Sequence, residues 1–551
     1  MRPAPKPYEA KPFKGTLAVA DFETWSFRHG RVPKPVCLGF FDGISKRMFW
    51  GSDCVADFRA WLASEKEAGT EYVIFMHNGG RFDFMFLLEG LDCGHALNVI
   101  NGRIIRMAAM GHEFRDSWAL FPQPLSAYEK DKFDYTVLEP ETVEANRAYI
   151  ERYCLNDCQY LYEIIAPFVE MYGDVLTVGS VAMKLLNSEY GFECLDERDD
   201  ATLRPFFFGG RVQPFETGDF RGKWKLYDVN SMYPAAMRNI EHPVSGYTNS
   251  KRIKDTTGFV RIIATSQGCL PYRLENGRLG FPFMRGEFLA SIHEIRAGQE
   301  LGLLKVHEVV IAYNFAHWTN FQRFVDPQFE MRQRAKDAND KARDLIHKRV
   351  GNSGYGKFAL DPRDFKEYRV LEDCESPGKV RTFDEPEGWF AEAEGEGYRI
   401  WERPTFGRLG RFLNVATAAS ITGAARANLM RGLAASTRPI YCDTDSIICE
   451  AFDGDIDKRR LGAWDLEAEA DRATIAAKKI YALWRDGECI KKASKGARLS
   501  EYEIVRVANG ELVEWKNDAP NFSFMREPTF VKRNIKRSDV ASETFAEDVE
   551  C

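Results

Sequence analysis

Tyr441-Cys442-Asp443-Thr444-Asp445-Ser446 is the stretch on which our prediction of the fold rests. Apolar residues on either side, Pro439-Ile440 before it and Ile447-Ile448-Cys449 after it, predict two strands joined by a tight turn with acids at its apex. Carboxylates clustered at a turn repel one another unless a cation joins them. The hexapeptide therefore predicts a metal-binding hairpin.

A second carboxylate, Asp228, lies far upstream in Tyr227-Asp228-Val229-Asn230-Ser231-Met232-Tyr233-Pro234. The run from Trp224 to Tyr227 predicts a strand, so Asp228 should lie where that strand ends and a helix begins. Together with the hairpin, this strand predicts a second α/β region. Between them we expect one long charged helix from about Gln328 to Val350.

The end of that helix carries Lys348-Arg349-Val350-Gly351-Asn352-Ser353-Gly354-Tyr355-Gly356-Lys357. Lys348, Asn352 and Tyr355 recur at helical spacing and can share one face. A run of charges on a helix is ordinarily a solvated face. The polar and aromatic residues at the same spacing favour a binding face instead.

The first third of the chain alternates β-rich runs with helical patterns, which predicts an α/β layer. The runs are Leu17–Ala20 and Tyr72–Met76, and the helical patterns are Phe82–Leu88 and Ala148–Ile165.

Acidic residues follow these elements. Asp21 and Glu23 are two apart on an extended chain, so both carboxylates point to the same side. Asp83 begins a helical pattern, and Tyr153 and Asp157 are one helical turn apart. Each motif alone has an ordinary explanation, as surface charge or as a helix cap. Their combination favours a second metal site.

The order D-x-E, N-x-x-x-F-D, Y-x-x-x-D resembles the three exonuclease motifs of the family B DNA polymerases. The segments around Asp228, Lys348 and Asp445 resemble the polymerase motifs D-x-x-S-L-Y-P, K-x-x-x-N-S-x-Y-G-K and Y-x-D-T-D-S, with Met232 in place of leucine. The amino-acid sequences of residues 228–237, 414–426 and 461–467 most resemble those of the protein-primed polymerases of tectivirus-type phages.

The resemblance implies an α/β and α+β multidomain fold, in which an RNase-H-like 3′→5′ exonuclease precedes a right-hand polymerase with two protein-priming insertions. The implied domains are listed by residue: 1–189 exonuclease, 190–245 first part of the palm, 246–328 insertion 1, 329–359 fingers, 360–408 insertion 2, 409–500 second part of the palm, and 501–551 thumb.

The resemblance also implies roles for residues of the first site. Four carboxylates would hold two Mg²⁺ or Mn²⁺ ions, Tyr153 would orient the attacking water, three residues would hold the unpaired 3′ end, and one lysine would lie near the scissile phosphate. The metal ligands would be Asp21, Glu23, Asp83 and Asp157, and the residue that orients the water would be Tyr153. The residues that hold the 3′ end would be Asn78, Phe82 and Ser117, and the lysine would be Lys132.

For nucleotide transfer, the resemblance implies that Asp228 and Asp445 hold two further Mg²⁺ or Mn²⁺ ions, with Val229 as an additional contact and Asp443 close by. The incoming nucleotide would be bound by Lys348, by Asn352, and by either Arg332 or Lys336, which we expect one to four turns earlier on the same helix. Tyr233 and Tyr355 would flank the base and sugar, and Tyr233 would exclude the 2′-hydroxyl of ribonucleotides.

Two short motifs are expected to contact DNA. Phe207-Phe208-Gly209-Gly210 resembles the Y-x-G-G/A link between exonuclease and polymerase, with Phe207 in place of tyrosine, and Gly209 and Gly210 would let the template approach the backbone. Lys479-Ile480-Tyr481 resembles the K-x-Y motif that contacts the primer strand. Implied partners are primer-template DNA, dNTPs, a terminal protein whose hydroxyl serves as first primer, and a single-strand DNA-binding protein.

Composition agrees with an enzyme of several domains. The 551 residues are 44% hydrophobic and 28% charged, and their net charge of −7 conceals basic clusters at 478–498 and 532–537, whose ordinary reading is solvated helix faces. The 12 cysteines include no zinc-type spacing, and no apolar run is long enough to span a membrane. We expect an intracellular monomer, in the host cytoplasm if the protein is viral.

Other functions were weighed against this one. A repair nuclease with a degenerate polymerase half would not need Asp228, Asp445, Lys348 and Tyr355 intact. A terminal-protein or single-strand-binding scaffold would have no use for the aligned carboxylates, and an RNA polymerase or reverse transcriptase would not need the linked exonuclease motifs. Primer extension with and without Mg²⁺ separates these alternatives.

Overall fold

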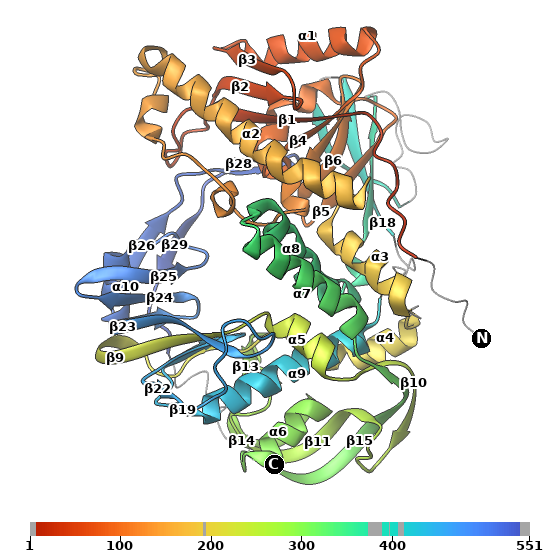
Figure 1. The fold of residues 1–551 in the computed structure, drawn as a ribbon, viewed down its shortest axis with the longest axis vertical. Coiled ribbons are helices and arrows are strands. Elements are labelled where there is room, and N and C mark those ends of the chain that lie inside the picture. Colours follow the sequence, from red (N-terminus) through yellow and green to blue (C-terminus); the bar gives the residue numbers. More distant parts are fainter. Residues whose placement is uncertain (1–6, 191–193, 373–387, 396, 406–412, 540–551) are drawn as a thin grey trace.

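A computed structural model describes residues 7–190, 194–372, 388–395, 397–405 and 413–539 of the chain (Figure 1). Parts of the predicted second insertion and residues 540–551 of the predicted thumb lie outside the described residues.

The N-terminal domain is built on a mixed β-sheet with the order β17-β18-β16-β5-β6-β7-β4-β1-β2-β3. Helix α2 (Arg147–Tyr172) crosses one face of this sheet, and α1 (Cys54–Glu67) lies beside β2 and β3 (Figure 1). The predicted strands and the second predicted helix are present, but the segment Phe82–Leu88 forms short 3₁₀ turns rather than an α-helix. The sheet strands are β1 (Thr16–Thr24), β2 (Pro35–Phe41), β3 (Lys46–Trp50), β4 (Tyr72–Met76), β5 (Ala96–Ile100), β6 (Arg103–Ala109), β7 (His112–Asp116), β16 (Lys366–Leu371), β17 (Phe390–Gly395) and β18 (Tyr398–Pro404).

Three strands of this sheet come from the predicted second insertion, far along the chain. Strand β16 pairs antiparallel with β5, through Tyr368 opposite Leu97, and β18 and β17 continue outward. Tyr368 and Val370 are buried in the same apolar cluster as Leu97. The segment predicted to be an insertion into the second domain therefore packs on the N-terminal domain instead.

The second sheet runs antiparallel in the order β25-β24-β23-β9-β21-β20-β8. The predicted hairpin is present as β20 and β21, and β21 lies between β20 and β9, so Ser446 is paired with Asp228. Helices α5 and α9 cover one face with apolar side chains. The basic cluster at 478–498 lies on strands rather than on helices. The elements are β8 (Val212–Pro214), β9 (Gly218–Val229), α5 (Met232–Asn239), α9 (Val415–Ala434), β20 (Tyr441–Asp443), β21 (Ser446–Cys449), β23 (Trp464–Ala477), β24 (Ile480–Arg485) and β25 (Glu488–Ser494).

The predicted first insertion forms a separate sheet in the order β10-β15-β11-β14, with α6 packed on it. This module begins at His242, before the predicted boundary at 246. Its elements are β10 (His242–Ser250), β11 (Thr257–Gln267), β14 (Phe283–Ser291), α6 (Ile292–Glu300) and β15 (Leu304–Thr319).

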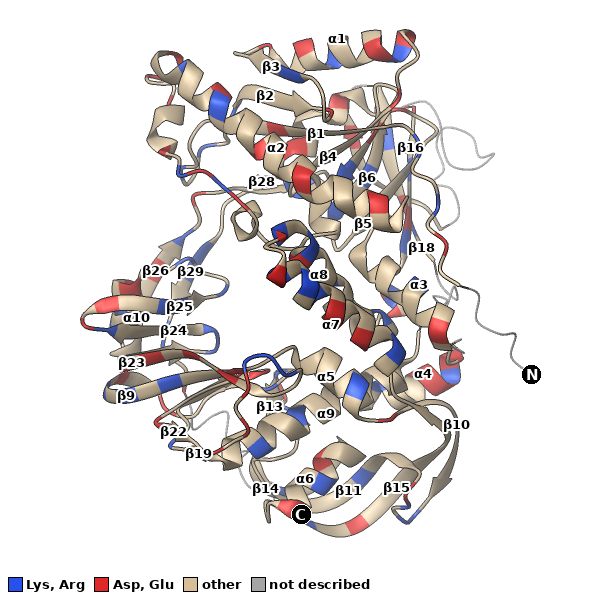
Figure 2. Ribbon diagram, in the orientation of Figure 1, with Lys and Arg blue, Asp and Glu red and all other residues tan. Residues whose placement is uncertain are grey.

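The long charged helix is two antiparallel helices, α7 (Gln322–Asp337) and α8 (Lys341–Phe358), which lie between the two large sheets (Figure 1). The break has a local cause: Asn339 adopts a positive φ of 56°, and the Asp340 side chain caps α8 by accepting a hydrogen bond from the Arg343 amide. Figure 2 shows charged residues along both helices, and on α8 the basic residues outnumber the acidic ones.

The C-terminal part returns from the second sheet to the N-terminal domain. Helix α10 (Glu501–Ala508) packs on β23 and β24, and the strand pair β26 (Val513–Lys516) and β29 (Lys532–Ile535) leads to the hairpin β27 (Asn521–Ser523) and β28 (Arg526–Thr529). Phe524, at the tip of the hairpin, is 6% exposed and belongs to the N-terminal core. The chain thus closes from one large sheet to the other (Figure 1).

Candidate active sites

Four predicted carboxylates meet in the N-terminal domain, and we call them the N-terminal carboxylate site: Asp21, Glu23, Asp83 and Asp157. Asp21 and Glu23 point the same way from β1 because side chains alternate along a strand. Asp83 and Asp157 are only 2% and 3% exposed. A cavity of about 1560 Å³ opens over Asp21, Glu23 and Asp157.

The electrostatics of this site favour a bound cation. Burial raises the pKa of Asp21 and Glu23 well above the ordinary range, and repulsion between the acidic neighbours adds to the effect. Burial also raises the pKa of Asp83 to about 8. Oδ1 of Asp157 is buried without a hydrogen-bond partner. A cation, or a water molecule bound to that cation, would give this oxygen a partner.

The lysine beside these carboxylates is Lys130, not Lys132. Lys130 Nζ donates to Asp157 Oδ2 at 2.7 Å and lies 5.2 Å from the centre of the Tyr153 ring. Burial alone would lower the pKa of Lys130, but the ion pair with Asp157 raises it overall. The Lys132 side chain is exposed and does not line the cavity. No local periodicity distinguishes two lysines two residues apart on a loop, which explains the wrong prediction.

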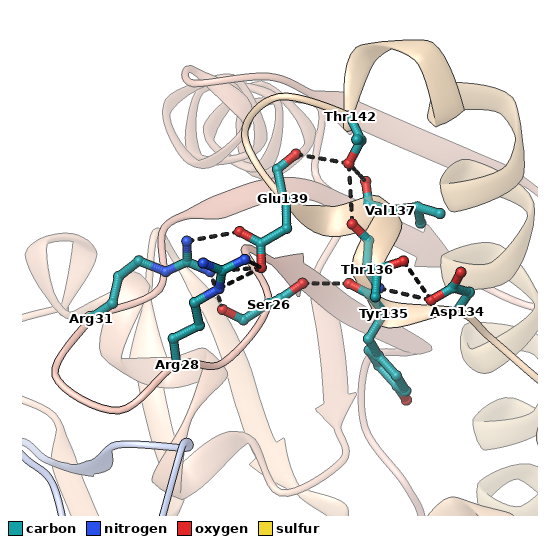
Figure 3. A network of polar contacts seen from close by, with 9 residues as sticks. All are labelled: Ser26, Arg28, Arg31, Asp134, Tyr135, Thr136, Val137, Glu139 and Thr142. Carbon is teal, nitrogen blue, oxygen red and sulfur yellow. Dashed lines mark hydrogen bonds and ion pairs between the residues drawn. The ribbon is translucent and has the colours of Figure 1, made fainter.

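Tyr153 is held in place by two aromatic residues of the segment that carries Lys130 and Lys132. Its ring stacks on Phe133 with centroids 3.9 Å apart, and its hydroxyl lies 3.1 Å from that of Tyr135. Figure 3 shows the contacts that fix this loop: Arg31 donates to both Glu139 carboxylate oxygens, at 2.8 and 3.2 Å, and Ser26 donates to the Tyr135 carbonyl. Tyr153 thus lines the cavity with its ring and hydroxyl both in contact with residues 133–135.

Two of the three residues predicted to hold a 3′ end line the cavity. Asn78 and Phe82 do so, whereas Ser117 is fully buried and hydrogen-bonded to His77 at 2.9 Å, so the residue that faces the cavity there is His77. The opposite wall is the C-terminal hairpin, where the Phe522 ring lies 5.3 Å from that of Phe82. No local sequence pattern predicts this wall, because about 440 residues separate the two phenylalanines.

The second group of acids, which we call the central carboxylate site, consists of Asp228, Asp443 and Asp445. The tight turn of the hairpin brings them together: the Val229 amide donates to the Asp445 carbonyl at 2.8 Å. Burial raises the pKa of Asp228 to about 8 and that of Asp445 to about 6, and repulsion between the acids adds to both. Among the described residues, neither has a cation at ion-pair distance.

Asp443 differs from its two neighbours because its charge is compensated. Lys479 Nζ donates to both of its carboxylate oxygens at 2.7 Å. Lys479, predicted to contact the primer, thus also holds Asp443. Tyr481, from the same motif, is 7% exposed and packs against Tyr441, so most of its surface lies in the core; its contact with the primer strand stays a prediction.

Two tyrosines stack beside the central site. The rings of Tyr233 on α5 and Tyr355 on α8 lie 4.1 Å apart at 20°. Burial raises the pKa of both hydroxyls, so both are neutral at physiological pH. The stack joins the helix after Asp228 to the helix that carries Lys348.

The candidate phosphate-binding cations come from two helices. Lys348 and Asn352 lie on α8, whereas Arg332 and Lys336 lie on α7, which corrects the expectation of a single helix. Arg332 is paired with Asp344 at 2.9 Å and donates to Ser231 Oγ at 3.3 Å. Partial burial and repulsion from Arg332 lower the pKa of Lys336 and of Lys348. Three cations gathered around the single carboxylate of Asp344 leave a positive charge that suits a triphosphate.

The segment that links the two domains packs directly on the hairpin turn. A Cβ at Gly210 would lie 2.5 Å from Thr444 Oγ1, so only glycine fits there. The carbonyls of Phe208 and Gly209 accept hydrogen bonds from Arg426, and that of Phe207 from Arg273. The glycine requirement therefore includes contact with the turn between β20 and β21, a reason that the motif alone did not indicate.

Comparison with known proteins identifies the class. The family model described as DNA polymerase type B, organellar and viral, matches residues 103–387. The chain belongs to the family B DNA polymerases of phage type, in the protein-primed branch, and is a DNA-directed DNA polymerase. It is 39% identical to the DNA-directed DNA polymerase of Enterobacteria phage PRD1, over 94% of this chain and 98% of that one.

More distant relatives share the fold. The DNA polymerase of Bacillus phage phi29 is 24% identical over 87% of each chain. The structure of phi29 DNA polymerase complexed with primer-template DNA aligns with a TM-score of 0.69 and 17% identity, over 95% of this chain and 100% of that one. This likeness confirms the predicted multidomain fold. Among the described residues, no helix is long and apolar enough to cross a membrane.

Proposed function

We propose that nucleotide transfer takes place at the central carboxylate site with two Mg²⁺ or Mn²⁺ ions. The observation that supports this most strongly is the contrast within the site: Lys479 forms an ion pair with Asp443, whereas Asp228 and Asp445 have no ion-pair partner among the described residues and keep raised pKa values. Two bound cations would activate the primer 3′-hydroxyl and neutralise the α-phosphate. Asp228, Asp445 and the backbone at Val229 would hold them.

The helices α7 and α8 would bind the nucleotide. Lys348 with either Arg332 or Lys336 would bind the triphosphate, and Asn352 lies on the same face of α8. Because Arg332 already has Asp344 as a partner, we favour Lys336 for the direct contact. Tyr233 and Tyr355 would form the floor under base and sugar.

We further propose that the N-terminal carboxylate site is a 3′→5′ proofreading exonuclease. Its carboxylates and the orphaned Asp157 oxygen fit two divalent cations, which would supply a hydroxide and stabilise the leaving oxyanion. Tyr153 would orient the water, Lys130 would neutralise the scissile phosphate, and Asn78 and Phe82 would hold the unpaired end.

One experiment tests both proposals. A 5′-labelled primer on a longer template, and the same primer alone, are incubated with the protein with EDTA or with Mg²⁺. We expect Mg²⁺-dependent extension with dNTPs and Mg²⁺-dependent shortening of the single strand. Extension without shortening would refute the exonuclease alone.

Protein priming and strand displacement are proposed from family membership and from the two insertions. The first insertion has its own sheet and core, and the second extends the N-terminal sheet, so both present surfaces beyond the two carboxylate sites. A terminal protein would bind there and offer a hydroxyl as first primer. We expect transfer of a labelled dNTP to the terminal protein of the same replicon, a product that resists denaturation; a single-strand DNA-binding protein is a further expected partner.

A further inference from the structure

A thiol lies within reach of the N-terminal carboxylate site. Cys154 follows Tyr153 on α2, is fully buried, and its Sγ donates to the Asp21 carbonyl at 3.4 Å. Its Sγ and one carboxylate oxygen each of Asp21 and Glu23 lie within 4.8 Å of one another. No role in the proposed nuclease requires this sulfur.

The donor set differs from that of a pure magnesium site. Mg²⁺ prefers oxygen ligands, whereas a thiolate beside carboxylates selects Zn²⁺ and its thiophilic relatives. Zinc binds sulfur at about 2.3 Å and oxygen at about 2.1 Å in a tetrahedron, which places neighbouring ligand atoms about 3.5 Å apart. The limit of 4.8 Å found for the three atoms is wider than this spacing, so metal binding would have to draw them together.

A second observation points to a ligand in the same place. Oδ1 of Asp157, one turn after Cys154 on α2, is buried without a hydrogen-bond partner. Its other oxygen is held by Lys130, so the carboxylate cannot turn away. This buried oxygen is a further unsatisfied acceptor on α2, although it lies outside the group of three ligand atoms that are within 4.8 Å of one another.

The central carboxylate site has no equivalent. Cys442 precedes Asp443, but on a strand the two side chains point to opposite faces. Among the described residues, the group with metal-ligand spacing is Asp21, Glu23 and Cys154.

We propose that Asp21, Glu23 and Cys154 form a site for one thiophilic divalent cation of the Zn²⁺ and Cd²⁺ class. On binding, the sulfur–metal bond replaces the sulfur–hydrogen bond and the proton passes to solvent. The consequence for activity rests on the proposed exonuclease: the soft cation occupies the place of a Mg²⁺ ion and slows degradation, while synthesis at the central site continues.

The test uses the full-length, metal-free protein in a phosphine reductant, titrated with Cd²⁺. Binding to Cys154 produces a thiolate-to-cadmium charge-transfer absorption in the ultraviolet. We expect it in the wild type and in Cys54→Ser, a control that alters another fully buried thiol of the same domain, on α1. We expect its loss in Cys154→Ser, and weakening in Glu23→Gln, which leaves the thiol intact; circular dichroism checks the fold of each variant.

Activity provides a second measurement. At constant Mg²⁺, the Zn²⁺ concentration that halves single-strand degradation should be at least about tenfold higher for Cys154→Ser than for the wild type. The Zn²⁺ dependence of primer extension should be the same for both. No absorption band in the wild type, or an unchanged band in Cys154→Ser, overturns the metal site. A Cys154-dependent band in a protein without nuclease activity upholds the metal site and refutes the exonuclease.

Discussion

Replacing Tyr233 with valine should relax the exclusion of ribonucleotides. The Tyr233 ring is packed at 4.1 Å against Tyr355, so it cannot move aside for an added hydroxyl. Forcing an extra group into a packed site costs about 1–3 kcal/mol, a factor of about 5 to 150 in discrimination. Valine removes most of the ring, and most of that factor should be lost.

The assay is single-nucleotide insertion on a primer-template, giving kcat/KM for a dNTP and for the matching rNTP. The matched control is Tyr233→Phe, which keeps the ring and removes only the hydroxyl; we expect it to retain the wild-type ratio. If Tyr233→Val lowers both efficiencies in parallel, Tyr233 is merely a packing residue. An unchanged ratio for valine would refute the steric argument.

Further predictions separate the two sites. Asp228→Ala or Asp445→Ala should reduce nucleotide addition to background and leave single-strand degradation intact; loss of both activities in a folded variant would contradict separate metal sites. Asp21→Ala combined with Glu23→Ala should stop degradation and raise misincorporation at a normal rate of extension, whereas an unaltered degradation rate would show that the first motif was misinterpreted. Lys130→Ala should slow degradation by about tenfold or more, and its neighbour Lys132→Ala should leave it unchanged, since only Lys130 contacts Asp157. The pKa of Asp83 and of Asp228 is raised to about 8, so ionisation of these groups destabilises the metal-free fold as pH rises from about 4 to about 8. Bound Mg²⁺ removes that cost, and the difference in Tm with and without Mg²⁺ should therefore widen between pH about 6 and about 8. A difference in Tm that stays constant over this range would refute the prediction.

Much of both sites could be predicted because the relevant geometry is local. Alternation on a strand brings Asp21 and Glu23 to one side, and helical spacing places Tyr153 one turn from Asp157. The hairpin with Asp443 and Asp445 follows from apolar residues that flank a short polar turn.

The remaining features depend on contacts between distant segments. The choice between Lys130 and Lys132 is made by an irregular loop that α2 holds over the carboxylates. Arg332 reaches the site from a separate helix because the chain reverses at Asn339, where Asn-Asp provides a local turn and cap signal within a run of charges that otherwise has helical spacing. Phe522 approaches Phe82 only because the last strands return to the first domain.

The pairing of β16 with β5 restricts how the molecule can be divided. A fragment ending near residue 189 would leave the backbone amides and carbonyls of β5 as a bare sheet edge and expose Leu97 to solvent. Unprotected edges of this kind recruit strands from other molecules. The N-terminal domain is therefore not separable at residue 189: an excised fragment should aggregate unless residues 366–404 are supplied with it, and shuffling between relatives must exchange these two distant segments together.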